Sequence, residues 1–175
     1  MELQDVITSR RSIRKFDDRL VSEEIIMEGI NHGIKAPSAH NRQPWKFKVL
    51  SLEEKNKVAD MLYEKTKDLV GHTGPHTANI IREVPHLIMI FIDNSIAENR
   101  DMDMLSIGAC IENMILSYTD NGLGTIWIGN TNIVSDEISK EFNVPYETIS
   151  CLGVGYKNQD PHARPRKDIE EVIIK

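Results

Sequence analysis

The stretch of residues 103–129, DMLSIGACIENMILSYTDNGLGTIWIG, constrains the fold more than any other part of the chain. Within residues 104–118, apolar or small side chains fill nearly every position. No single stripe with a period of about 3.6 residues stands out, which is typical of a helix buried on most sides. Asn121-Gly122 then supplies a left-handed helix stop, and residues 124–129 have the pattern of a short strand. We therefore predict a buried helix that leads into a buried strand at the centre of the fold.

Length and charge limit the class of protein. The chain has 175 residues, of which 40% are hydrophobic, which is enough for one domain with a single core. Its net charge of -6 argues against a general binder of nucleic acid or of anionic membranes. No charge-free apolar run approaches the length that a bilayer requires, and the first residues lack an apolar signal core. We therefore expect a cytoplasmic protein with no nucleic-acid or membrane partner.

The segment of residues 10–16, RRSIRKF, is basic in a chain that is acidic overall. If it is extended, the period of two places Arg10, Ser12 and Arg14 on one side, with a hydroxyl between two guanidinium groups. Such a row suits a phosphate or a ring that carries partial negative charge. The alternative is a solvated turn whose charges pair with the acids that follow it, Asp17, Asp18 and Glu23.

Residues 36–45, APSAHNRQPW, form a loop with a proline near each end, which leads into a strand predicted over residues 46–50. Its two side-chain amides, Asn41 and Gln43, each present a donor and an acceptor, as the edge of a heterocycle requires. Ordinary loop chemistry is the alternative interpretation, because Asn, Ser and Pro are common in turns.

The remaining pattern predicts helices over residues 3–9, 22–35, 51–69 and 135–143, strands over 85–93 and 148–156, and an amphipathic end over 168–175. Strand 85–93 is a continuous apolar run, which is typical of a central strand covered on both faces. Only nine residues, 94–102, separate it from the central helix, too few to build a lid. Residues 158–166 form a proline-rich loop that ends in a second basic cluster, Arg164, Arg166 and Lys167.

The cysteines and histidines do not predict a metal site. Cys110 and Cys151 lie in separate apolar segments without CxxC spacing, so we interpret them as reduced core thiols. His72 and His76 have a spacing that invites a metal. However, the Gly74-Pro75 pair would break a helix that aligned them, and no cysteine or carboxylate nearby completes a site.

Four motifs follow one another in the order seen in the nitroreductase-like FMN oxidoreductases, and the chain resembles that family over nearly its whole length. They are RRSIRKF, APSAHNRQPW, GACIENMILSYTDNGLGTIWIG and LGVGYKNQDPHARPRK. The resemblance implies a single FMN-binding domain over residues 1–175 with an α+β fold. Its central sheet would be mixed, mostly antiparallel and flanked by helices. The resemblance also implies an intertwined homodimer with FMN at the two subunit interfaces.

Carried over by position, the resemblance implies three groups of FMN contacts. The ribityl-phosphate and the pyrimidine side would be held by Arg10, Arg11, Ser12 and Arg14, with Arg164 and Arg166 completing the phosphate clamp. The flavin would be lined from the partner subunit by Pro37, Ser38, Ala39, Asn41 and Gln43. Backbone amides near flavin N5 and O4 would come from Trp127, Ile128 and Gly129.

The implied activity is a two-step exchange. NADH or NADPH passes a hydride to flavin N5, and a small acceptor such as a nitroaromatic or a quinone is then reduced in the same place. The flavin carries the chemistry, so we expect no protein nucleophile or general base. A dehydrogenation, a reductive removal of a substituent, and a flavin-binding or redox-sensing module with little turnover remain alternatives. A Rossmann domain fits least, because GLGTIWIG follows a helix and lacks the GxGxxG spacing.

Three features depart from larger family members. The short link 94–102 leaves no room for the helices that often shape the substrate channel, so we expect an open pocket with broad acceptor choice. A basic residue that some members place against the ring has Arg82 as its nearest candidate. Glu112 stands in the helix predicted to be buried, where an amide is common, so we expect it to have a partner or a raised pKa.

Overall fold

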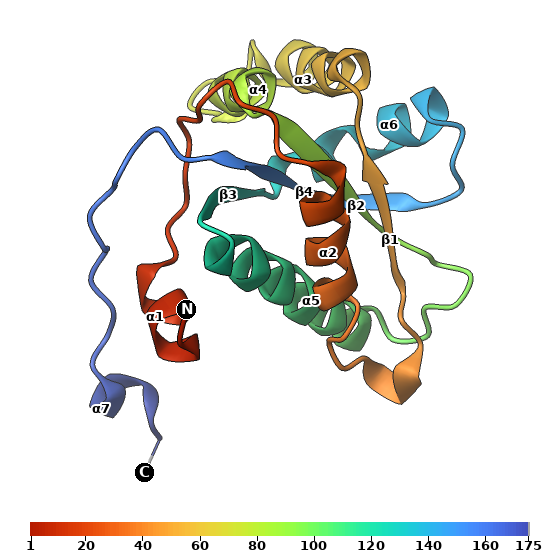
Figure 1. Ribbon diagram of the computed structural model, residues 1–175. Helices are drawn as coiled ribbons and strands as arrows, with labels where there is room; N and C mark the ends of the chain where they lie inside the picture. The colour runs from red at the N-terminus through yellow and green to blue at the C-terminus, as the bar shows by residue number, and fades with distance from the viewer. Residues whose placement is uncertain (175) are drawn as a thin grey trace.

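A computed structural model describes residues 1–174 and shows four strands in one antiparallel sheet (Figure 1). The strands are β1 (Trp45–Val49), β2 (His86–Ile92), β3 (Leu123–Ile128) and β4 (Glu147–Tyr156), in the spatial order β1-β2-β4-β3. A parallel bridge joins Ser12 to Thr125 of β3. The predicted α+β fold with a mostly antiparallel sheet is confirmed.

Helices cover both faces of the sheet (Figure 1). One face carries α3 (Leu52–Thr66), α4 (Gly74–Glu83) and α6 (Ser135–Glu141), and the other carries α2 (Glu23–Gly33) and α5 (Arg100–Asp120). Short elements complete the chain: α1 (Leu3–Ser9), α7 (Ile169–Val172) and the 3-10 turns η1 (Ala39–Asn41) and η2 (Asn130–Val134). None of the helices within residues 1–174 is both long and apolar enough to cross a bilayer.

Strand β2 separates two hydrophobic cores. Ile88, Ile90 and Ile92 pack on the side of α5, whereas Leu87, Met89 and Phe91 pack on the side of α3 and α4. This alternation follows from the period of two along a strand, and it confirms that the apolar run is covered on both faces. The two cysteines lie in these cores, one in each, as free thiols, and burial raises the pKa of both to about 12.

Local sequence signals account for the helix ends, but the start of α4 differs from the prediction. Ser51 and Glu54 form a capping box at the start of α3, and α5 ends before Gly122, whose φ of 75° is the predicted left-handed stop. The sequence pattern does not predict helix α4, because a Gly-Pro pair, here Gly74-Pro75, is typical of a helix break. In the structure this pair begins α4, where a proline lacks no hydrogen bond that the helix needs.

Helix α5 is fully buried along one face, and the positions beside that face are mostly half-buried. Its buried residues recur at helical spacing and are Asp103, Ser106, Ile107, Cys110, Ile111, Met114, Ile115 and Tyr118. On the opposite side, Met102 is 49% and Leu105 is 70% exposed. Within residues 104–118, Leu105 and Glu112 are exposed and all other positions are buried or half-buried. The prediction of a helix buried on most sides is therefore confirmed except along this exposed strip, where a single chain leaves apolar side chains uncovered.

After β4 the chain leaves the sheet and runs past α1 to α7 (Figure 1). Every residue from 162 to 174 is exposed, including Ile169 of α7. The amphipathic end predicted over residues 168–175 contains α7, and its last residue, Lys175, lies outside the described residues. We call residues 157–174 the C-terminal tail.

Candidate functional site

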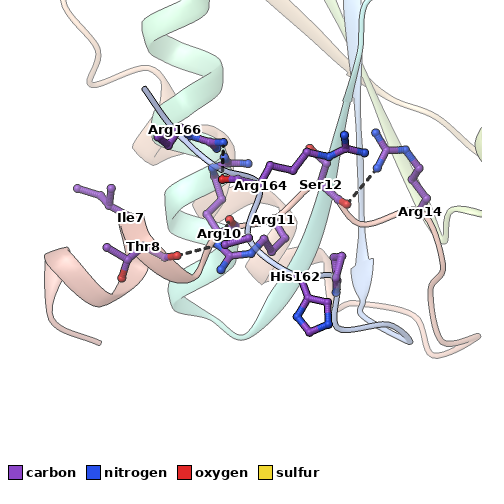
Figure 2. Close-up of a pocket in the computed structure, with 11 residues that line it drawn as sticks. Ile7, Thr8, Arg10, Arg11, Ser12, Arg14, His162, Arg164 and Arg166 are labelled. Atoms are coloured by element: carbon purple, nitrogen blue, oxygen red, sulfur yellow. Dashed lines mark hydrogen bonds between the residues drawn. The ribbon is translucent and has the colours of Figure 1, made fainter. Parts of the chain in front are cut away.

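The two basic clusters, which are far apart in the sequence, line one cavity of about 530 Å³ (Figure 2). We call it the arginine cavity. Its N-terminal wall consists of Ile7, Thr8, Arg10, Arg11, Ser12 and Arg14, and its C-terminal wall of Pro161, His162, Ala163, Arg164 and Arg166. The structure thus brings together all six residues that the resemblance assigned to the phosphate and pyrimidine side.

Extended backbone sets the N-terminal wall. The backbone N–H of Ile13 donates to the carbonyl of Thr125 over 2.8 Å, and the Ile13 side chain is buried. Because side chains alternate along an extended chain, Ser12 and Arg14 point the other way and are exposed. The predicted row of a hydroxyl between guanidinium groups follows from this alternation.

The C-terminal tail is guided to the cavity by the same N-terminal segment. Phe16 forms an antiparallel bridge with Lys157, and the N–H of Asn158 donates to the carbonyl of Lys15 over 3.0 Å. The tail therefore starts beside residues 15–17 and passes along the other wall of the cavity. His162 lines the cavity as well. It is not among the predicted contacts, although its alternation with Arg164 and Arg166 is a signal for it.

The cavity is strongly cationic. Arg11, Arg14 and Arg166 donate to nearby backbone carbonyls, Arg11 over 2.7 Å to Thr8. Among the described residues, one carboxylate lies within ion-pair distance of a cavity arginine: Glu112, 3.8 Å from Arg10 Nε. The Glu112 side chain is 48% exposed, so its predicted burial is wrong: it lies on the exposed face of α5. The cavity keeps an excess of positive charge.

The loop of residues 37–43, which we call the amide loop, lies elsewhere in the chain. It contains the second predicted group of contacts, Pro37, Ser38, Ala39, Asn41 and Gln43. The N–H of Ala39 donates to Ser106 Oγ near the start of α5, whereas Met1 pairs with Asp120 at its end. A helix of 21 residues is about 30 Å long, and Figure 1 shows η1 and α1 at its opposite ends. One chain therefore does not bring the amide loop to the arginine cavity.

The third predicted group, Trp127, Ile128 and Gly129, ends strand β3. Ile128 is buried and pairs with Cys151, whereas Trp127 is exposed, with its ring beside Gly108 of α5. Ser12 of the N-terminal wall bridges to Thr125, which precedes Trp127 by two residues on β3. These residues are neighbours of the arginine cavity in the sheet, although they do not line it.

Two other candidates, Arg82 and His72, lie outside the cavity. Arg82 donates to Asp60 over 2.7 Å. His72 Nδ1 accepts the N–H of Gly74 at the start of α4. Within residues 1–174, no three His, Cys, Asp or Glu side chains gather in a way that could hold a metal ion.

The sequence is similar to known proteins over nearly its whole length. A sequence model of the nitroreductase family matches residues 7–156. A relative from Methanothermobacter thermautotrophicus, named as a candidate NADH dehydrogenase/NAD(P)H nitroreductase, is 27% identical over 178 residues, covering 99% of this chain and 87% of its own. The iodotyrosine deiodinase of Thermotoga neapolitana is 23% identical over 188 residues, covering 99% and 96%.

A solved structure shows the same fold. The crystal structure of a candidate nitroreductase in complex with FMN from Desulfovibrio desulfuricans superposes with a TM-score of 0.85 at 24% identity, covering 100% of this chain and 96% of that one. The matched range 7–156 includes the N-terminal wall of the cavity, whereas Arg164 and Arg166 follow it.

Proposed function

Because this chain belongs to the nitroreductase family, we propose that it is an FMN-dependent oxidoreductase that uses NADH or NADPH to reduce a small organic acceptor. A nitroaromatic or a quinone is the kind of acceptor we expect. The observation that carries the proposal is the convergence of two basic clusters on one cavity in a chain with a net charge of -6. The names of the relative from Methanothermobacter thermautotrophicus and of the FMN complex support it.

The residues of the arginine cavity fit the phosphate end of FMN. Guanidinium groups bind phosphate oxygens bidentately, and five arginines line this cavity. Its volume of about 530 Å³ lies within the usual range for small-molecule sites. When bound, FMN supplies a carrier that accepts a hydride from NAD(P)H and delivers it to an acceptor.

The protein side chains hold and tune this cofactor. We assign Arg14, Arg164 and Arg166 to the phosphate, and Arg10 with Ser12 to the pyrimidine side. A fixed cation beside that edge stabilises the negative charge that reduction places there, and it does so without any reorganisation of solvent. The backbone of Trp127, Ile128 and Gly129 would meet the opposite edge of the ring. No side chain is needed as a nucleophile in this scheme.

A second copy of the chain would complete the site. The amide loop and the arginine cavity lie at opposite ends of α5, whose exposed face carries Met102 and Leu105. If two copies of α5 pack antiparallel about a two-fold axis, the amide loop of each copy lies next to the arginine cavity of the other. We therefore include a homodimer in the proposal.

A second candidate is the reductive removal of a substituent from an aromatic substrate. The relative from Thermotoga neapolitana, which is an iodotyrosine deiodinase and matches 99% of this chain, favours it. The short link between β2 and α5, residues 93–99, contains no helix that would narrow the substrate choice. Steady-state assays with nitroaromatics, quinones and halogenated phenols would separate the two reactions, and a flavin module with little turnover would reduce none of them.

The first test is the visible absorption spectrum of the purified protein, followed by anaerobic titration with NADH and with NADPH. We expect a yellow protein whose absorption bleaches with at least one donor. A colourless protein that cannot be reconstituted with FMN would contradict the proposed function. A yellow protein that neither donor bleaches would retain the cofactor assignment and contradict the electron donor.

A further inference from the structure

The amide loop holds an unusual backbone. His40, Asn41 and Gln43 have φ values of 52°, 55° and 51°, which place three non-glycine residues in the left-handed region within four positions. Non-glycine residues adopt this region at a cost in free energy, so the surroundings must hold them there. Two of the three, Asn41 and Gln43, are proposed flavin contacts.

A buried carboxylate stands behind this loop. Asp103, in the first turn of α5, is completely buried and accepts three hydrogen bonds. Its Oδ1 accepts from Arg42 Nε over 3.1 Å and lies 3.0 Å from Arg42 Nη2 in an ion pair. Its Oδ2 accepts the backbone N–H groups of Glu98 and Asn99 over 3.1 Å each. One side chain thus fixes the amide loop, the β2–α5 link and the start of α5 relative to one another.

Arg42 transmits this constraint to the middle of the loop. Its side chain is 10% exposed, and it lies between Asn41 and Gln43 in the sequence. The ends of the loop are tied separately, by Gln43 N–H to Ser38 Oγ over 3.0 Å and by Ala39 N–H to Ser106 Oγ over 3.3 Å. A buried ion pair is weak support for stability by itself, so its value here lies in fixing one conformation of the loop.

We propose that Arg42 and Asp103 are positioning residues for the flavin: they fix the left-handed backbone that presents Asn41 and Gln43 to the cofactor in the second copy. This inference rests on the proposed function. The pair acts on flavin affinity and on the flavin's surroundings without touching the flavin, and neither residue belongs to the three groups of proposed contacts.

The test compares three variants with the wild-type protein. Arg42→Lys keeps the charge and removes the guanidinium fork. The double variant Arg42→Met/Asp103→Leu replaces the pair with apolar side chains of similar size, a change that proteins often tolerate without loss of stability. Arg100→Met is the matched control, because it removes a bidentate pair with Glu147, with N–O distances of 3.0 and 2.6 Å, at the same end of α5.

Three quantities are measured for each protein: the unfolding temperature, the dissociation constant of FMN by fluorescence quenching, and the visible circular dichroism of bound FMN. We expect the double variant to fold, with an unfolding temperature slightly below that of the wild type because the N–H groups of Glu98 and Asn99 lose their acceptor. It should bind FMN roughly tenfold more weakly and change the dichroism of the flavin. Arg42→Lys should show an intermediate effect, and Arg100→Met should bind FMN as the wild type does.

Wild-type affinity and dichroism in the double variant would overturn the positioning role. If the double variant does not fold, Arg42→Lys decides by the same two readouts. A wild-type protein that binds no FMN would instead contradict the proposed function. In that case hydrogen exchange at the Gln43 amide still tests the loop: exchange faster in Arg42→Lys than in the wild type supports the constraint, and equal exchange refutes it.

Discussion

The two parts of the proposed site, the arginine cavity and the amide loop, are built in opposite ways. The cavity owes its charge to arginine side chains that lie outside the helices, and three of the five donate to nearby backbone carbonyls. The amide loop consists of backbone in a costly conformation, held by a fully buried carboxylate. The arginine cavity thus supplies the charge of the site, and the amide loop supplies a fixed backbone shape. We expect each arginine substitution to lower the FMN affinity by a limited factor, whereas loss of the buried carboxylate should disturb the whole amide loop at once.

The largest expected effect comes from removing the buried carboxylate alone. Asp103→Ala removes the buried partner of Arg42 and leaves it only the exposed Glu98, and it deprives the N–H groups of Glu98 and Asn99 of their acceptor. Removal of one member of such a buried pair costs about 3–5 kcal/mol in the free energy of unfolding. Urea unfolding measures it. The control is Asp60→Ala, which removes an exposed pair with Arg82 and should change stability little. Equal losses of stability in the two variants would show that the buried pair stabilises the amide loop no more than an exposed pair stabilises the surface.

The next effect concerns the cavity. Arg14→Ala and Arg166→Ala should each weaken FMN binding by roughly tenfold or more, because each removes a charged hydrogen-bond donor from the phosphate. The loss should shrink as ionic strength rises, since salt screens exposed charges. The control is Arg19→Ala, which removes an arginine that pairs with Asp17 outside the cavity. Unchanged FMN affinity in both cavity variants would contradict the phosphate assignment.

A smaller effect of opposite sign is expected for Glu112→Gln. The carboxylate lies 3.8 Å from Arg10 Nε, so its loss should increase the positive potential of the cavity. FMN should bind roughly threefold to fivefold more tightly at low salt. Fluorescence titration at two ionic strengths measures this change. Weaker binding would show instead that Glu112 orients Arg10, and the cavity would then depend on geometry as the loop does.

These results also show how much of the molecule can be predicted from the sequence. The helices and strands were mostly predictable because their hydrophobic periods are local, and Gly122 ended α5 as expected. The shared side of the extended segment that carries Arg10, Ser12 and Arg14 was predictable for the same reason, because side chains alternate along such a segment. Arg42 and Asp103 were not, because 61 positions separate them and only the fold brings them together. The exposed strip of α5 at Leu105 and Glu112 was not predictable either, because composition does not reveal whether a neighbour belongs to the same chain.

The smallest expected effect is a loss of stability at acidic pH that arises from His86, away from the proposed FMN site. His86 Nε2 accepts the N–H of Val21 over 3.0 Å, and burial, followed by the nearby Lys55, lowers the pKa of His86 below its usual 6.5. On acidification the unfolded chain therefore binds its proton first, so stability falls as the pH drops below about 6.5. Unfolding at pH 5 and pH 7.5 measures this loss.

The control for this effect is His86→Gln, which should reduce the difference in stability between the two pH values. A slope as steep as that of the wild type would assign the pH dependence to other groups. Protonation of His86 should not change the FMN affinity of the folded wild-type protein over the same pH range. His86 lies in β2 and is not among the residues of the arginine cavity or of the amide loop.

The exposed C-terminal tail has a consequence for the life of the protein in a cell. It is tied to the body near its start, through Lys157 and Asn158, and every residue from 162 onward is exposed. A protease that cut before Arg164 in the free chain would remove two of the cavity arginines and leave the sheet and both cores untouched. If these arginines hold FMN as proposed, the cut molecules would lose FMN while they keep their fold. Assays of protein amount would then overstate the amount of protein that carries the cofactor.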